Sequence, residues 1–231
     1  MNDADTAARS KPWVTLTIIG LNVVVFLLCL VLGADVLSPS PTTMHILGGS
    51  SKVATLGGHD WWRVVTAAFL HYGIIHLALN MFSLYALGTL VERLLGRRPY
   101  AAVYLVSALL GGVVSLLTMS RNAVSVGASG AVFGIIGALG TYLLVNRARI
   151  DPDAWKRSMG QVGLMLGVNL VYGFTNPSID NGAHVGGLLA GAAATWLLAA
   201  PMPDAARAKR ALAVAGGGVA VTLGLLFVMS R

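Results

Sequence analysis

The sequence is poor in charged residues. Aspartate, glutamate, lysine and arginine make up 11% of its 231 residues, whereas a soluble domain carries about a quarter. Hydrophobic residues make up 56%, and the mean hydropathy is +0.75. This composition excludes an ordinary soluble protein. It indicates an all-α polytopic membrane protein, and one domain accounts for its length.

Cysteine is almost absent as well. Cys29 is the only one and lies within an apolar run, which excludes a disulfide framework and a multi-cysteine metal site. The net charge of +7 would suit nucleic acid, but the basic residues stand mostly in short loops between apolar runs. We therefore expect a lipid bilayer as the partner of this chain, and not nucleic acid.

Acidic residues are scarce. The chain has nine, and no aspartate lies inside an apolar run. This absence argues against an aspartyl mechanism, which needs two carboxyl groups within the membrane. The sequence also lacks His-Glu-x-x-His, the signature of many zinc proteases. His71, His76 and His184 could in principle hold a metal, but a serine site suits the pattern better, and no cofactor is expected.

Seven apolar runs predict seven membrane-spanning helices. The runs are residues 14–32, 73–95, 100–119, 129–145, 161–174, 184–199 and 211–229, of which the fifth is short for a span. A cytoplasmic N-terminus would place twelve of the sixteen Lys and Arg residues inside, which is the bias that membrane insertion favours. The second, fourth and sixth runs would then begin at the outer surface.

The fourth run opens with Gly127-Ala128-Ser129-Gly130, an unusual place for a hydroxyl group. Glycine allows other backbone to approach Ser129 closely. The start of a helix also offers free N–H groups and a positive dipole end to a developing negative charge. We therefore interpret Ser129 as a candidate nucleophile.

His184 is the candidate base. It precedes Gly187 and Gly191, which form a small-residue face like that of Gly130-x-x-x-Gly134 in the fourth run. Two such faces can touch closely and place a hydroxyl beside an imidazole, which can accept its proton at neutral pH. Asp180 is interpreted as a solvated loop acid, so we expect a Ser–His dyad and not a triad.

Polar residues also share one face of the second run, where His76, Asn80 and Ser83 have helical spacing. Polar groups inside a membrane are costly unless they meet partners or water. One interpretation is a structural stripe of hydrogen bonds between helices. Because two donors fall at the depth of Ser129, we favour a functional site.

Three blocks, taken together, make the sequence resemble a rhomboid intramembrane serine protease. They are Trp62-Arg63 followed by His71-x4-His76-x3-Asn80, then Gly127-Ala128-Ser129-Gly130, then Ala183-His184-x2-Gly187-x3-Gly191. The resemblance implies a six-helix catalytic core at residues 14–200. A cytoplasmic tail at residues 1–13 would precede it, and a linker with a seventh helix at residues 201–231 would follow.

The resemblance also implies roles for individual residues. Ser129 would be the nucleophile, and His184 would be the general base and later the acid. The oxyanion would be stabilised by His76, Asn80 and the backbone N–H of Ser129. Supporting roles would fall to His71, to Gly127 and to Phe133, an aromatic residue expected either to pack on His184 or to belong to the core.

The expected reaction is hydrolysis of a peptide bond in or near the transmembrane segment of a membrane protein. One alternative is a catalytically inactive rhomboid-like protein that binds transmembrane helices. Another is a small transporter, which lacks support because the sequence has no inverted repeat and no acid at mid-membrane. We expect a bacterial plasma membrane, with a mitochondrial inner membrane as the alternative, and an active site that opens to the outer side.

Three further features carry predictions. The short fifth run and the turn residues after it suggest that this run and residues 175–182 form a mobile gate for substrate. Gly216-Gly217-Gly218 weakens the seventh run as a helix, so we expect it to be loosely attached and without a catalytic role. Glu92, beside Arg93, is expected to form a structural ion pair or hydrogen bond.

Overall fold

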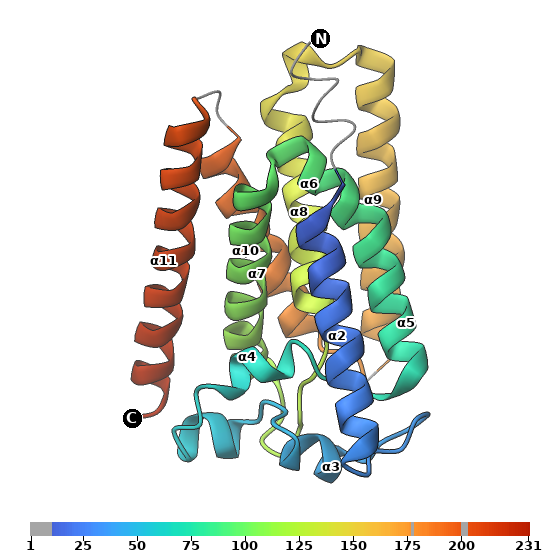
Figure 1. The fold of residues 1–231 in the computed structure, drawn as a ribbon, viewed down its shortest axis with the longest axis vertical. Helices are drawn as coiled ribbons and strands as arrows, with labels where there is room; N and C mark the ends of the chain where they lie inside the picture. The colour runs from blue at the N-terminus through green and yellow to red at the C-terminus, as the bar shows by residue number, and fades with distance from the viewer. Residues whose placement is uncertain (1–10, 177, 200–202) are drawn as a thin grey trace.

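The computed structural model describes residues 11–176, 178–199 and 203–231, which form a bundle of long helices (Figure 1). Within these ranges no β-strand is found, so the predicted all-α class is confirmed. Among the residues that the structure describes, four helical stretches are long and apolar enough to cross a membrane, namely Trp13–Val31, Gly73–Leu95, Arg97–Thr118 and Asp204–Met229. Most of the predicted N-terminal tail and the predicted boundary at residue 200 lie outside the described residues.

Each of the seven predicted runs coincides with helix. The helices that coincide with these runs are α2 (Trp13–Val31), α5 (Gly73–Ser83), α6 (Thr89–Leu95), α7 (Arg97–Thr118), α8 (Ser129–Val145), α9 (Pro152–Thr175), α10 (Asn181–Leu198) and α11 (Asp204–Met229). A π-helical turn, η2 (Leu84–Gly88), joins α5 and α6 into one span. Three short elements, α3 (Pro41–Ile46), η1 (Lys52–Gly57) and α4 (Arg63–Ala67), lie at the end of the bundle that is lower in Figure 1, and η3 (Arg147–Arg149) lies at the other end.

The fifth run was predicted to be short, and this is wrong because α9 has 24 residues. The helix begins at Pro152, a residue suited to the first turn, and the Asp151 carboxylate caps it by accepting the N–H of Ala154 at 2.9 Å. Hydropathy missed this start because residues 152–160 are largely polar. Short length therefore no longer supports a gate, and Pro177, part of its turn signal, lies outside the described residues.

The closest helix packing in the bundle joins α8 and α10. Gly187 lies against the carbonyl oxygen of Gly130, and Gly191 lies against that of Gly134, so closely that a Cβ at either position would overlap the oxygen. On its other side α10 meets α7, where a Cβ at Gly186 would lie 2.6 Å from the Cβ of Val114. The predicted contact between two small-residue faces is confirmed, and such contact is how helices associate in lipid.

Adding one methyl group to this contact should destabilise the bundle. We expect Gly191→Ala to lower the free energy of unfolding by about 1–3 kcal/mol, the usual cost of overpacking, because backbone stands where the Cβ would go. Gly167→Ala in α9 is the matched control, since nothing lies within 4 Å of a Cβ built there. The control should gain up to about 1 kcal/mol from better helix propensity. Unfolding titrations in mixed micelles would compare the two, and equal effects would contradict the packing.

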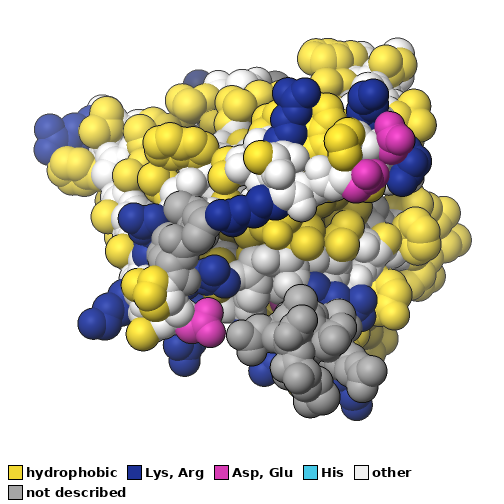
Figure 2. All heavy atoms as spheres, turned by 90° about the horizontal axis from the view of Figure 1, so that it is seen from above, with side chains coloured by type: hydrophobic (Ala, Val, Ile, Leu, Met, Phe, Trp, Pro, Cys, Tyr) yellow, Lys and Arg dark blue, Asp and Glu magenta, His cyan; other side chains and the backbone are white. Residues whose placement is uncertain are grey.

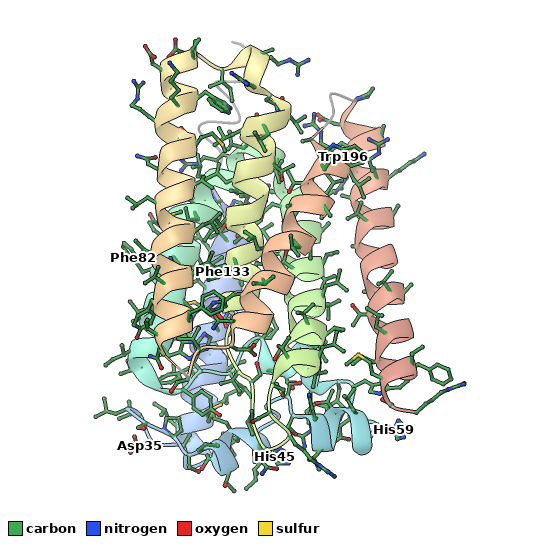
Figure 3. All side chains as sticks on the ribbon, turned by 180° about the vertical axis from the view of Figure 1, so that it is seen from behind. Asp35, His45, His59, Phe82, Phe133 and Trp196 are labelled. Atoms are coloured by element: carbon green, nitrogen blue, oxygen red, sulfur yellow. The ribbon has the colours of Figure 1, made fainter. Side chains whose placement is uncertain are left out.

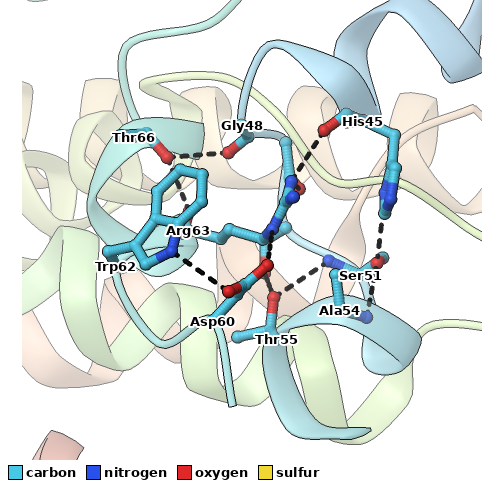
Figure 4. A network of polar contacts seen from close by, with 11 residues as sticks. His45, Gly48, Ser51, Ala54, Thr55, Asp60, Trp62, Arg63 and Thr66 are labelled. Atoms are coloured by element: carbon cyan, nitrogen blue, oxygen red, sulfur yellow. Dashed lines mark hydrogen bonds and ion pairs between the residues drawn. The ribbon is translucent and has the colours of Figure 1, made fainter. Parts of the chain in front are cut away.

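The segment between α2 and α5 is held together by Arg63, which is only 9% exposed. Its Nη1 donates to the carbonyl oxygens of His45 at 2.7 Å and Gly49 at 3.1 Å, and its Nε pairs with Asp60 at 3.0 Å (Figure 4). The Arg63 guanidinium lowers the pKa of the Asp60 carboxyl and also lies 4.7 Å from the ring centre of Trp62. Arg63 therefore fixes the backbone of the segment between α2 and α5.

The seventh helix packs closely, contrary to the prediction of loose attachment. A Cβ at Gly218 would lie 2.5 Å from Val106 of α7, so the glycine permits close approach at that point. Leu226 is 1% exposed, and the indole N–H of Trp61 donates to the hydroxyl of Ser230 at 3.1 Å. The end of α11 is therefore tied to the segment that precedes α4.

Glu92 connects two helices by hydrogen bonds, as predicted. Its carboxylate, in α6, accepts the backbone N–H groups of Val14 at 3.0 Å and Thr15 at 2.8 Å, and the Thr15 hydroxyl at 2.7 Å. These N–H groups stand at the start of α2, where no helical carbonyl can reach them. The buried acid therefore caps α2 from a neighbouring helix, and its oxygens are used there.

Candidate active site

Ser129 is the first residue of α8, as the sequence predicted, and is half-buried. Two residues before Ser129, Gly127 has an unusual backbone conformation, with φ of +130°. An L side chain rarely adopts this conformation, so the motif needs glycine there. The N–H of Gly127 donates to the carbonyl oxygen of Ala67 at 2.8 Å, which ties the turn before Ser129 to the end of α4.

Ser129 and His76 face the same small space beside Gly127. A Cβ built on Gly127 would lie 3.7 Å from the Ser129 Oγ and 3.0 Å from the His76 Nε2. The other ring nitrogen, Nδ1 of His76, accepts the backbone N–H of Tyr72 at 3.2 Å. A neutral His76 ring therefore carries its proton on Nε2, the nitrogen that faces Gly127. The structure thus places a hydroxyl and an N–H donor around one point.

His184 lies in the first turn of α10 and is 8% exposed. Its ring stacks on Phe133, with the ring centres 4.0 Å apart and the planes inclined by 12°. Figure 3 shows Phe133 inside the bundle, in contrast to Phe82 and Trp196 on its outer surface. The aromatic packing proposed for Phe133 is confirmed, and it holds the imidazole without using either ring nitrogen.

The hydrogen bond expected between Ser129 and His184 is not found among the described residues, and the His184 Nδ1 is buried without a partner there. The two residues nevertheless open neighbouring helices whose backbones touch at Gly130 and Gly187. Catalytic hydrogen bonds are often long before substrate binds and tighten afterwards. The dyad therefore stays a prediction.

Asn80 and His71 lie close to His76 but differ in what they can offer. Asn80 is buried, and its amide donates to the His76 carbonyl oxygen at 2.9 Å, which uses one of its two N–H groups. The His71 ring lies edge-on to that of His76, with centres 5.0 Å apart, and its Nδ1 contacts the carbonyl oxygen of Phe69 at 3.2 Å. Burial, aided by His76, lowers the pKa of His71 to about 3, so this ring is neutral at physiological pH.

A cavity of about 20 Å³ lies behind the turn that carries Ser129. Its lining includes Ser50, Ser125, Gly127, Gly130 and Ala183. This volume is enough for about one water molecule, and the two hydroxyl groups offer polar partners. The cavity therefore provides room for water on the inner side of the turn.

The sequence-based interpretation of Asp180 is wrong, because this acid is half-buried and bonded on three sides. One carboxylate oxygen accepts the Ala183 N–H at 2.9 Å and caps α10, the helix of His184. The other accepts the hydroxyl of Ser125 at 2.5 Å and also that of Ser115 in α7. Asp180 thus joins the helix of the candidate base to the loop before Ser129. An aspartate directly before Asn181-Gly182 and a helix is an N-cap signal that could have found the cap.

Removing this carboxylate should cost more than a helix cap alone. Asp180→Ala loses the cap, worth about 1 kcal/mol, and leaves two serine hydroxyls without their acceptor, at about 1–3 kcal/mol for each buried unsatisfied group. Asp151→Ala, which removes only the exposed cap of α9, is the matched control. The midpoint of thermal unfolding in detergent should fall clearly further for Asp180→Ala. A similar fall in both variants would contradict the linking role.

The described residues therefore make up a helical membrane protein in which a serine, two histidines and an asparagine lie toward one end of the bundle, in α5, α8 and α10. The chain belongs to the rhomboid family, since the rhomboid domain family matches residues 58–201.

Relatives support this membership. The chain is 32% identical over 204 residues to Rhomboid protease GluP of Bacillus subtilis, which covers 88% of this chain and 38% of that protein. It is 36% identical over 155 residues to RHOMBOID-like protein 6, mitochondrial, of Arabidopsis thaliana, with 67% and 49% covered. It is 33% identical over 153 residues to Inactive RHOMBOID-like protein 8 of the same plant, with 66% and 42% covered. The chain thus spans less than half the length of each of these relatives.

Proposed function

We propose that this chain is an intramembrane serine endopeptidase that cleaves a peptide bond in or near the transmembrane segment of membrane-protein substrates. The observation that carries the proposal is the convergence of the Ser129 hydroxyl and the His76 Nε2 beside Gly127. The imidazole of His184 is held on Phe133 of the adjoining helix. Membership in a family with a relative named as a protease adds support.

In the proposed reaction the Ser129 Oγ attacks the carbonyl carbon of the scissile bond while His184 takes the hydroxyl proton. The tetrahedral intermediate carries its negative charge on the former carbonyl oxygen. The C–N bond then breaks, and His184 returns the proton to the leaving amine. A water molecule, deprotonated by His184, next attacks the acyl carbon. The ester bond to Ser129 then breaks, the carboxylic acid leaves, and His184 returns the proton to the Ser129 Oγ.

The N–H groups available for the oxyanion are the His76 Nε2–H, the second amide N–H of Asn80 and the backbone N–H of Ser129. The Tyr72 N–H supports the required tautomer of His76, because it donates to Nδ1 and leaves the proton on Nε2. The start of α8 adds the positive end of a helix dipole at the same place. Such preorganised donors typically supply a few kcal/mol each in the transition state.

We also propose an orientation with the N-terminus in the cytoplasm and the active site toward the outer side, in a bacterial plasma membrane. Lys and Arg side chains gather at the end of the bundle remote from Ser129, as seen in Figure 2. This is the distribution expected for a cytoplasmic face. A substrate would have to enter between helices. The candidate helix to move aside is α9, because only Val162 and Gly173 of this helix are buried.

The nucleophile is tested by Ser129→Ala on a reporter with one transmembrane helix and small residues near its outer end. We expect cleavage to fall to background, because an alanine side chain has no hydroxyl group with which to form the acyl-enzyme. Ser120→Ala, in an exposed loop, is the control and should cleave at the wild-type rate. Gel analysis of the reporter would show the product. Persistent cleavage by the Ser129 variant would overturn the proposal, and no cleavage by any form would favour an inactive helix-binding protein, as one relative is named inactive.

The oxyanion donors are tested through His76→Ala. We expect kcat to fall by about 10²–10³-fold with little change in KM, because the donor acts on charge that exists only in the transition state. His59→Ala, which changes an exposed histidine away from the site, is the control. Kinetics on the same reporter would separate the two parameters. A higher KM with unchanged kcat would instead assign His76 to substrate binding.

A further inference from the structure

A second concave site lies at the end of the bundle opposite Ser129. It is a cavity of about 300 Å³, lined by residues at the end of α6 and at the starts of α7 and α11. These helix ends lie in the upper part of the bundle as drawn in Figure 1. Its charged lining consists of Arg93, Arg97, Arg98, Arg207, Glu92 and Asp204. Four arginines thus line one cavity, and they come from three different helices.

The two acids do not neutralise the four arginines. Both carboxylate oxygens of Glu92 are engaged by the start of α2. Asp204 lies 3.8 Å from Arg207, and its side chain is 98% exposed, so the pair is weak. For the other three arginines, no carboxylate lies within ion-pair distance among the residues that the structure describes. The cavity therefore carries a positive charge that a ligand could neutralise.

Helix geometry adds to this charge. α7, with 22 residues, begins at Arg97 and has no side-chain cap, so its first N–H groups and positive dipole end lie at the cavity wall. The neighbouring start of α2 is similar in position but is satisfied by the buried Glu92 carboxylate. The start of α2 thus binds a carboxylate of the protein itself, whereas the start of α7 is free to bind an anion from a ligand.

We propose that this cavity binds a phosphate group, presented by the headgroup of an anionic phospholipid. Arginine is suited to phosphate because its planar fork forms paired hydrogen bonds with two oxygens. Isolated arginines are common at a membrane surface, but these four line one cavity. The cavity lies where one candidate span ends at Leu95 and the next begins at Arg97. Basic pockets of this kind between membrane helices suit acidic lipid headgroups.

The test uses the purified full chain in detergent, with the retention of added phosphatidylglycerol measured by native mass spectrometry. We expect the double variant Arg97→Gln, Arg98→Gln to bind this lipid at least tenfold more weakly, at roughly fivefold for each charge removed. The double variant Arg149→Gln, Arg157→Gln is the control, because it removes two exposed arginines that do not line the cavity. Equal affinities for the two double variants would overturn the proposal and leave only general attraction to a basic surface.

A competition experiment separates the two sources of phosphate. Both soluble compounds carry the phosphate group but lack acyl chains, so inorganic phosphate or glycerol 3-phosphate at the same concentration as phosphatidylglycerol should displace little of the lipid from the wild type. Displacement of most of the lipid at equal concentration would overturn the lipid assignment in favour of a soluble phosphate compound. Circular dichroism checks the fold of each variant. Should the Arg97, Arg98 variant fail to fold, Arg93→Gln replaces it, and wild-type affinity in that variant would overturn the site.

Discussion

The contact between α8 and α10 is the constraint on which the rest of this structure depends. Gly187 and Gly191 let α10 meet the backbone of α8 at Gly130 and Gly134, and a Cβ at either of the two α10 positions would overlap a carbonyl oxygen of α8. Ser129 and His184 occupy the corresponding first turns of these helices, so the contact sets the distance between hydroxyl and imidazole. In a membrane, where apolar surface alone does not drive helices together, close packing is what can hold two side chains in register.

Two carboxylates, one buried and one half-buried, provide the second level of organisation. Glu92 joins α6 to the start of α2, and Asp180 joins the start of α10 to α7 and to the loop before Ser129. In both, the charge is matched by N–H and hydroxyl donors and not by a cation, which suits an interior where an unpaired charge would be costly. Arg63 is a buried cation, and its guanidinium is matched mainly by acceptors of the backbone. These are two carbonyl oxygens, and the carboxylate of Asp60 adds an ion pair. Each of these groups fixes backbone near a helix end.

Much of this arrangement could be predicted from the sequence. Hydropathy located the seven helices, and the spacing of small residues predicted the face of α10 that meets α8. Hydropathy did not predict the start of α9, because the first turns of this helix are polar. The close attachment of α11 was not predicted either, because the sequence does not show that Gly218 faces α7. The partners of Asp180 could not be predicted, since Ser115 and Ser125 are distant in the chain and serine hydroxyls carry no periodic signal. The roles of the site residues remain predictions.

The most direct test of the proposed Ser129–His184 dyad is to locate the residue that a fluorophosphonate probe modifies, because such probes react with activated serines. The full chain would be labelled in detergent and digested, and the adduct assigned by mass spectrometry. We expect a single adduct on Ser129 that is lost when His184 is replaced by alanine. An adduct on another serine, or labelling of Ser129 that does not depend on His184, would contradict the proposed dyad.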